Sequence, residues 1–107
     1  MESTSHGGVI RVVFVLLDHS LVLDWAGPAE ALRIANRCLV AAGRPERFRI
    51  EFAGPQASTH GSVGVQVSSL APLPAHWTDE PTWIVLPGQT GQTIDVSSDA
   101  SRALLHW

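Results

Sequence analysis

The hydrophobic positions near the start of the chain form one continuous run. Residues 9–17, VIRVVFVLL, are almost all β-branched, leucine or aromatic. Apolar side chains on both faces of an extended segment are typical of a central strand that is covered on both sides in a parallel sheet. The run therefore predicts a first strand over residues 9–17, followed by a loop over residues 18–27.

A helical spacing of apolar residues follows this loop. Apolar side chains recur at three- and four-residue intervals between Leu32 and Ala42, so one face of this segment is predicted to pack on a sheet. Pro28 suits the first position of a helix, because its ring fixes φ and its missing N–H is not needed there. Gly43 supplies a left-handed C-cap. We therefore predict a helix over residues 28–42.

Shorter patterns predict two more strands and a hairpin. Residues 47–55 alternate apolar and charged side chains, which favours a strand near a sheet edge. Residues 57–74 contain two short extended pieces around Gly61 and Gly64, which indicate a small hairpin-like excursion. Residues 82–88, TWIVLPG, predict a second buried strand that ends in a glycine-bearing loop.

The last predicted element is a helix that Ser98 caps and that starts near Asp99. Strand, helix, strand, hairpin, strand and helix predict an α/β fold with an open, mainly parallel sheet and helices on both faces. Residues 1–8 are expected to be a disordered N-terminus. Residues 9–107 are expected to form one domain that is incomplete at the C-terminus, because the last helix stops with apolar side chains still to be buried.

Composition narrows the class of protein. The chain has 107 residues, of which 45% are hydrophobic and 16% charged, the balance of a globular protein. Its net charge of −3 and its lack of lysine argue against direct contact with nucleic acid. No apolar run reaches the ~20 residues of a membrane span and no signal peptide is evident, so we expect a cytoplasmic protein with no membrane partner.

Candidate chemistry lies in the loops after the predicted parallel strands, because open α/β sheets bind ligands beyond the carboxyl ends of their strands. Asp24 follows the first strand and Gly88 follows the last one, so these two residues could line one crevice. A carboxylate near a helix start also serves as a helix cap, and spacing alone leaves both interpretations of Asp24 open. The GQTGQ stretch lacks the pattern of a phosphate-binding loop and favours a plain turn.

Other reactive side chains are predicted to be inert. Cys38 lies in the middle of the predicted helix and is expected to be buried by packing, far from any group that would activate its thiol. Asp18, His19 and Ser20 are the side chains of a hydrolase triad, but neighbours in one loop rarely reach the geometry of a triad. The five histidines show no pairwise metal spacing, so neither a metal nor a cofactor is expected.

Several stretches carry a family resemblance. Residues 23–36, LDWAGPAEALRIAN, resemble the motif Leu-Asp-x-x-Gly-Pro-x-Glu of the ThiJ/PfpI, class I glutamine amidotransferase-like superfamily. The stretches ANRCLVAAGRPERFRIEFAGP, SVGVQVSSLAPLP and WIVLPGQTG are more similar to GlxA-type regulators than to the isocyanide hydratases of the same branch. GlxA-type regulators join such a domain to an AraC-type helix-turn-helix. The resemblance covers most of residues 10–107 and implies a flavodoxin-like fold.

The resemblance also implies roles for single residues. The acid at the position of Asp24 points toward a cysteine on a sharp strand-to-helix turn, and the loop of Gly88 contributes a backbone amide near the reacting centre. The common Pro-Gly-Gly of that loop is Pro87-Gly88-Gln89 in this chain. The expected ligand-binding residues are therefore Asp24, Gly88 and Gln89. Three residues at the helix start are expected to be structural: Gly27, Pro28 and Glu30.

The family's nucleophilic cysteine would lie beyond Trp107, so covalent catalysis by these residues is not expected. The resemblance implies the N-terminal, ligand-sensing portion of a GlxA-type AraC-family transcriptional regulator, with an unidentified small-molecule ligand and with DNA contact through a domain absent from these residues. The alternative is a fragment of an isocyanide hydratase or an amidase-like enzyme. A complete interaction module is disfavoured, because an uncovered sheet edge would invite aggregation or homodimerisation.

Overall fold

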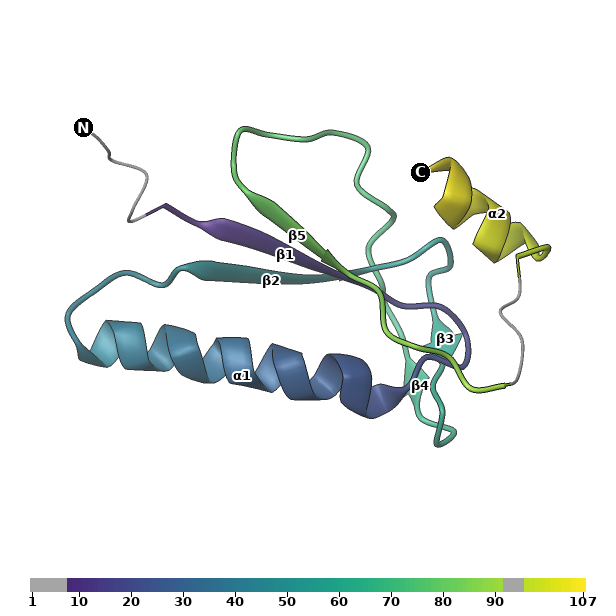
Figure 1. Cartoon of the computed structure of the whole chain (residues 1–107), viewed down its shortest axis with the longest axis horizontal. Coiled ribbons are helices and arrows are strands. Elements are labelled where there is room, and N and C mark those ends of the chain that lie inside the picture. Colours follow the sequence, from purple (N-terminus) through teal and green to yellow (C-terminus); the bar gives the residue numbers. More distant parts are fainter. Residues whose placement is uncertain (1–7, 92–95) are drawn as a thin grey trace.

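A three-stranded parallel sheet lies at the centre of the computed structural model, which describes residues 8–91 and 96–107. β1 (Ile10–Val15) pairs with β2 (Phe48–Ala53) on one side and with β5 (Thr82–Val85) on the other, so the strand order is β2-β1-β5 (Figure 1). The strands lie where the sequence predicts them. The protein is therefore α/β, and its architecture is compatible with the predicted open class.

β1 is the most deeply buried segment of the described chain. Its hydrophobic run continues into Leu16, and the side chains from Val12 to Leu16 are fully buried or nearly so. Only the middle strand of a three-stranded sheet has a neighbour on each side and cover on both faces. The continuous apolar run thus predicts the central strand correctly.

One helix packs on each face of the sheet. α1 (Val22–Ala41) places Trp25, Ala29 and Leu32 against the side chains of β1 that point to its face. α2 (Asp99–His106), with Trp107 just after it, covers part of the opposite face, where Leu104 and Trp107 contact a cluster of Val13, Val15 and Ala53. The predicted placement of helices on both faces is therefore confirmed.

The excursion between β2 and β5 contains the predicted hairpin. β3 (Thr59–His60) pairs antiparallel with β4 (Gln66–Val67), and Gly64 adopts a φ of 82° in the turn between them. The chain then returns beside β2, where Ala71 forms a bridge with Ala53. This route places the hairpin at the carboxyl end of β1.

The start of α1 corrects the sequence prediction. The helix begins at Val22 rather than at Pro28, so the predicted loop 18–27 is shorter and Pro28 lies inside the helix. A residue outside the helix stabilises this first turn of α1: Ser62 Oγ accepts the Val22 N–H at 3.2 Å. The end of α1 is as predicted: Gly43 has a φ of 77°.

The position of β5 is a second correction. The sequence predicts a buried strand, but β5 forms an edge of the sheet, and Trp83, Ile84 and Leu86 are about half exposed. Its apolar composition matches that of a central strand, yet no strand of the described residues lies on its outer side. Burial of a strand depends on its neighbours, which composition alone does not specify.

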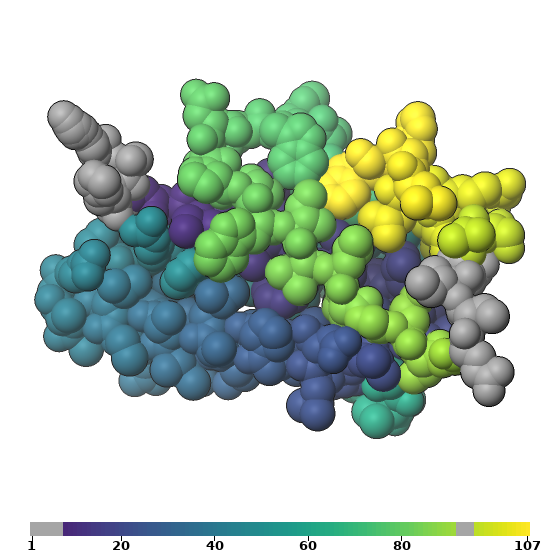
Figure 2. Space-filling view, viewed as in Figure 1, coloured from purple at the N-terminus to yellow at the C-terminus, as the bar shows by residue number. Residues whose placement is uncertain are grey.

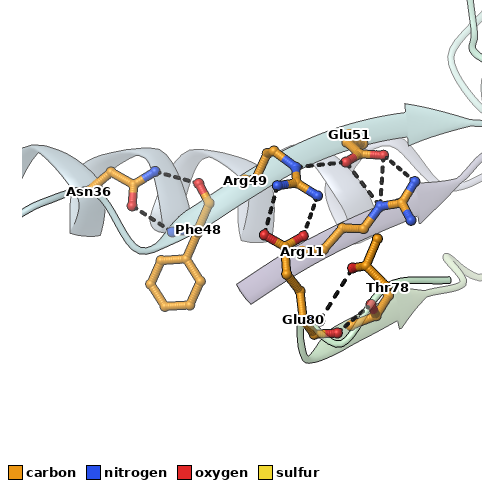
Figure 3. A network of polar contacts seen from close by, with 8 residues as sticks. Arg11, Asn36, Phe48, Arg49, Glu51, Thr78 and Glu80 are labelled. Carbon is orange, nitrogen blue, oxygen red and sulfur yellow. Dashed lines mark hydrogen bonds and ion pairs between the residues drawn. The ribbon is translucent and has the colours of Figure 1, made fainter. Parts of the chain in front are cut away.

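Charged side chains join the three strands on the face away from α1. Arg11 of β1 donates to Glu51 of β2 at 3.0 Å, and Arg49 donates both to Glu51 and to Glu80, which stands just before β5 (Figure 3). On the α1 side, the buried Asn36 amide donates to the Phe48 carbonyl oxygen at 2.8 Å. These contacts fix how β2 sits against β1 and α1.

Two sequence expectations fall wholly or partly outside the described residues. The disorder expected over residues 1–8 is one, since only Gly8 of that segment is described, and the loop that runs on into Gln92 is the other. Within residues 8–91 and 96–107, we find no helix with the length and hydrophobicity needed to cross a membrane.

Candidate functional site

The candidate site is built from loops that meet at the carboxyl edge of the sheet. Because β1, β2 and β5 run in parallel, the segments that follow them emerge at the same edge. Residues 16–21 follow β1, residues 54–56 follow β2 and residues 86–91 follow β5. The β3–β4 hairpin joins them there (Figure 1). This is the edge at which open α/β sheets bind their ligands.

The loop after β1 is held in a tight conformation. Ser20 Oγ donates to the Leu17 carbonyl oxygen at 2.7 Å and accepts from the Leu17 N–H at 3.1 Å, which closes a short turn. Within that turn His19 has a φ of 68°, in the left-handed region that a residue with a Cβ rarely adopts.

Neighbouring segments keep His19 in this conformation. The His19 N–H donates to the His60 carbonyl oxygen at 2.7 Å, and the His19 carbonyl oxygen accepts from the Thr90 N–H at 2.9 Å. Strained backbone persists where the surroundings fix it, and such positions cluster at functional sites. The side chain of His19 is exposed at the carboxyl edge.

The structure brings Asp24 and Gly88 together, 64 positions apart in the sequence. The Gly88 N–H donates to Asp24 Oδ2 at 3.0 Å, and the Leu21 N–H donates to the Gly88 carbonyl oxygen at 2.8 Å. A Cβ at position 88 would lie only 3.0 Å from Asp24 Oδ2 and 3.2 Å from Leu21 Cδ1, so glycine permits this close approach. Asp24 therefore ties the first turn of α1 to the loop after β5.

This contact argues against the helix-cap interpretation of Asp24, whereas its role in ligand binding stays a prediction. The N-cap residue of α1 is Leu21, which makes no side-chain capping bond, and Asp24 lies in the first turn. Its carboxylate accepts from another loop, so Asp24 is a tertiary link. The Gly88 amide, which the resemblance assigns to a reacting centre, is already bonded to this carboxylate.

Gln89 links the same loops from the other side. Its Nε2 donates to the Asp18 carbonyl oxygen at 2.9 Å, and its backbone forms an antiparallel bridge with Ser20. Asp18 in turn accepts the His60 N–H on Oδ1 at 3.0 Å. The loop after β1 is thus bonded to the hairpin and to the loop after β5.

A cavity of about 280 Å³ opens beside these loops. This volume is close to the lower end of the range for small-molecule sites, roughly 300–1,000 Å³. The loops that follow β1, β2 and β5 contribute to its wall, together with the start of α2. The lining residues are Leu17, Asp18, His19, Gln56, Gln89, Thr90, Ser98, Asp99, Ala100 and Ser101.

The cavity lies beside the predicted crevice between Asp24 and Gly88. Of the three expected ligand-binding residues, only Gln89 lines the cavity. Asp24 and Gly88 are not among its lining residues and are joined to each other by a hydrogen bond of 3.0 Å. The open space lies on the other side of Gln89, between the loop after β1 and the start of α2.

The cavity wall is rich in hydrogen-bonding groups. Two side-chain amides, an imidazole and a threonine hydroxyl stand with the carboxylates of Asp18 and Asp99, and no arginine is among the lining residues. At the α2 end, Ser98 Oγ accepts the Ser101 N–H at 3.1 Å, which is the predicted helix cap. These groups can bind a small polar molecule through several directed hydrogen bonds.

Sequence analysis missed most of this wall. The predicted ligand-binding loops after the first and last strands include Asp18, His19 and Thr90, but Gln89 is the one cavity-lining residue that the sequence singled out as ligand-binding. Gln56 was missed although it follows β2, and a position directly after a parallel strand was the signal that could have found it.

The residues expected to be structural lie away from the cavity. Gly27 and Pro28 are exposed on α1, and no atom lies within 4 Å of a Cβ built at Gly27. Glu30 is also exposed and forms an ion pair with Arg33 at 2.9 Å. The Arg33 hydrogen bonds, followed by its charge, lower the pKa of the Glu30 carboxyl.

The position of Cys38 contradicts the sequence expectation. Its thiol is exposed on the outer side of α1 rather than buried by packing. Cys38 lies fourteen residues after Asp24 in the same helix. At about 1.5 Å per residue this places it roughly 21 Å away along the axis. The chain's one cysteine is therefore not a nucleophile beside Asp24.

No group of three or more histidine, cysteine or carboxylate side chains gathers closely enough to hold a metal ion within residues 8–91 and 96–107. A scan of protein-family models and searches of curated proteins and of solved structures returned no match to this chain. The proposal of a function accordingly rests on the sequence motif and on the geometry of the carboxyl edge.

Proposed function

We propose that this chain is the N-terminal, ligand-sensing portion of a GlxA-type AraC-family transcriptional regulator, and that its fold is the flavodoxin-like, class I glutamine amidotransferase-like fold of ThiJ/PfpI domains. Two features support the proposal. One is the stretch LDWAGPAEALRIAN, which resembles the family motif. The other is the three-stranded parallel sheet with a helix on each face.

The observation that carries the sensing role is the cavity at the carboxyl edge. Its walls come from segments far apart in the sequence, from Leu17 to Ser101, so a ligand bound there would contact the loops that follow all three strands and the start of α2. A ligand that bridges such segments stabilises their mutual arrangement and can shift it. In the proposed regulator this change would pass to a DNA-binding domain.

The proposal places DNA contact outside these residues. The net charge of −3 does not supply the basic surface that binds the phosphate backbone. A helix-turn-helix in another part of the protein would make that contact, and the whole regulator would act in the cytoplasm.

The hydrolase alternative has one observation in its favour. Asp24 stands beside a loop amide, the arrangement that a fragment of an isocyanide hydratase or an amidase-like enzyme would share. Such an enzyme needs a thiol near Asp24, and Cys38 lies on the outer side of α1. The resemblance places that thiol beyond Trp107, so the two functions share the geometry of the described residues.

The reading frame after the Trp107 codon discriminates between the two functions. A frame that encodes the rest of the domain and then two helix-turn-helix units supports the regulator. A frame that encodes a cysteine-bearing strand-to-helix turn and stops soon afterwards contradicts it in favour of the enzyme.

Ligand binding at the cavity can be tested on the chain itself. We expect acetamide, guanidinium or acetate, titrated separately, to shift the amide resonances of residues 17–19, 89–90 and 98–101 in a ¹H–¹⁵N spectrum. Gln56→Trp should abolish these shifts, because an indole at this exposed wall position would fill the cavity. Gln66→Trp, an equally exposed change in β4, is the matched control. Shifts that persist in Gln56→Trp, or an absence of shifts with all three probes, would contradict a binding site here.

A further inference from the structure

A second hollow lies next to the candidate cavity, and one side chain lines both. This hollow is formed between residues 54–57, which follow β2, and residues 70–73, which lead away from the hairpin, and its volume is about 250 Å³. We call it the apolar pocket and the candidate cavity the polar cavity. Gln56 is a lining residue of both. The two spaces are therefore neighbours at the carboxyl edge of the sheet.

The lining of the apolar pocket is mainly aliphatic. Besides Gly54 and Gln56, its wall consists of two prolines, two leucines and an alanine, at positions 55, 57, 70, 72 and 73. Pro55 and Pro72 lack a backbone N–H and so offer fewer hydrogen bonds than other residues would. No charged side chain is among the described lining residues. Such a surface suits an apolar group better than it suits water.

Backbone hydrogen bonds hold the two walls of the apolar pocket together. The Gly54 N–H donates to the Ala71 carbonyl oxygen at 3.0 Å, and the Leu70 N–H donates to the Ala57 carbonyl oxygen at 2.9 Å. A Cβ at position 54 would lie only 2.6 Å from the Leu16 carbonyl oxygen, so glycine permits this close packing. The pocket is thus preformed, and a ligand that enters it loses little binding energy to rearrangement.

The polar cavity and the apolar pocket also share a supporting layer. Residues 98–101, at the start of α2, line the polar cavity. Leu73 of the apolar pocket packs on the same cluster of sheet residues as Leu104 and Trp107, at the other end of α2. Figure 2 shows the segment that precedes β5 against this C-terminal end of the helix. Docking of α2 therefore supports both spaces.

Gln56 does not separate the two spaces permanently. Its side chain is exposed and forms no hydrogen bond with the part of the chain that the structure describes. An exposed side chain of this kind changes rotamer within nanoseconds. One molecule can therefore extend through both spaces, with its polar group among the hydrogen-bonding side chains of the polar cavity.

We propose that the apolar pocket is a second subsite of the candidate ligand site, and that it takes the short aliphatic chain of a small molecule whose polar head occupies the polar cavity. The inference rests on the proposed sensing function and gives its ligand a chemical class. Continuity with the polar cavity through Gln56 selects this occupant. A protein partner would need roughly 20–30 residues on each side, far more than the seven that line this pocket.

Ligands of increasing chain length test the proposal on the full chain. Acetamide, butanamide and hexanamide share one head, and ¹H–¹⁵N spectra follow their binding. We expect the dissociation constant to fall about tenfold or more from acetamide to hexanamide, because each fully buried methylene strengthens binding up to about fourfold. Hexanamide should shift the amide resonances of Gly54, Ala57 and Leu73 as well as those of residues 17–19 and 89–90. Guanidinium with butylguanidinium, and acetate with hexanoate, apply the same test to a cationic and an anionic head.

The outcomes distinguish this inference from the proposed function. Equal affinities of short and long compounds at residues 17–19 and 89–90 would overturn the apolar subsite and leave the sensing site intact. Shifts from the long compounds that are confined to residues 54–57 and 70–73 would also overturn it, because the chain would then bind without its head. An absence of shifts with every compound would contradict both proposals.

A substitution in the apolar pocket gives an independent answer. Ala57 is exposed and lines this pocket, so Ala57→Glu should remove most of the preference for hexanamide over acetamide, because a carboxylate there keeps the pocket hydrated. Ser58→Glu is the matched control: Ser58 is the next residue, is equally exposed and is not among the lining residues of either space. Its preference for hexanamide should match that of the parent. Equal preferences in the two variants would overturn the proposal.

Discussion

At the scale of single residues, Asp24 shows how one carboxylate connects two distant parts of the chain. It lies in the first turn of α1, where the helix dipole favours negative charge, and it accepts the Gly88 N–H at 3.0 Å. Gly88 is suited to this contact because a Cβ there would press against both Asp24 and Leu21. The pair holds the loop after β5 next to the loop after β1.

Two substitutions of Asp24 should separate the contribution of its charge to stability from that of its hydrogen bond with Gly88. Asp24→Ala removes the charge and the acceptor, and we expect it to lower the free energy of unfolding by about 1 kcal/mol. Asp24→Asn keeps an oxygen that can accept from Gly88, so its loss should be about half as large or less. Urea denaturation of both variants measures the difference. Equal losses would show that the bond to Gly88 contributes nothing to stability.

At the scale of elements, the strands are joined by charge as well as by their backbones. Arg11 lies between Glu51 and the ring of Trp77, whose centroid is 6.0 Å from the guanidinium carbon. The hydrogen bonds from Arg11 are the main reason why the pKa of Glu51 lies below its ordinary value, and partial burial opposes them. Arg49 strengthens the effect and reaches on to Glu80.

This arrangement predicts a dependence of stability on pH. Because the pKa of Glu51 is lowered in the folded state, its contribution is complete above the ordinary carboxyl pKa of 4.5 and is lost as the pH falls through the lowered value. Glu51→Gln should therefore cost about 1 kcal/mol at pH 7 and almost nothing well below pH 4. Urea denaturation across this range measures the cost.

Glu46→Gln is the control for the pH experiment. Glu46 is exposed and forms no ion pair in the described part of the chain. Its substitution should leave both stability and pH dependence close to those of the parent. A difference between parent and Glu51→Gln that stays constant with pH would rule out ionisation of Glu51 as the cause.

At the scale of the whole molecule, the core is concentrated on β1, and the two faces of the sheet are covered unequally. The long α1 covers one face, while the opposite face is covered at its carboxyl end by α2 and the segment around Leu73. Trp107 holds this second layer in place: its Nε1 donates to the Pro74 carbonyl oxygen at 2.7 Å and its ring lies 5.6 Å from that of Trp77. Docking of α2 also completes the cavity.

Removal of Trp107 should detach this layer. We expect Trp107→Ala to cost about 2 kcal/mol, less than a fully buried tryptophan because the ring is partly exposed. Hydrogen exchange should accelerate through α2 while α1 keeps its protection. Leu105→Ala, at a position on α2 that is 70% exposed, should change stability by less than about 0.5 kcal/mol. Unchanged exchange in α2 after Trp107→Ala would show that other contacts dock the helix.

The sequence by itself determined the elements whose signals are local. Three such signals are the apolar run of β1, the left-handed Gly43 at the end of α1 and the Ser98 cap of α2. Each depends on residues only a few positions apart, so the sequence alone is enough to predict its effect. The alternation in β2 likewise indicated an edge strand, and β2 forms an edge of the sheet.

Only the tertiary structure decided which distant segments meet. The hydrogen bond from the Val22 N–H to the Ser62 hydroxyl stabilises a start of α1 six residues before Pro28. β5 is exposed because no strand of the described residues pairs with its outer side. A hydrogen bond joins Asp24 to Gly88, and Gln89 with the start of α2 lines the cavity beside them. Such contacts join residues tens of positions apart, and no local preference of the backbone encodes them, because their energy depends on the packing of the whole sheet.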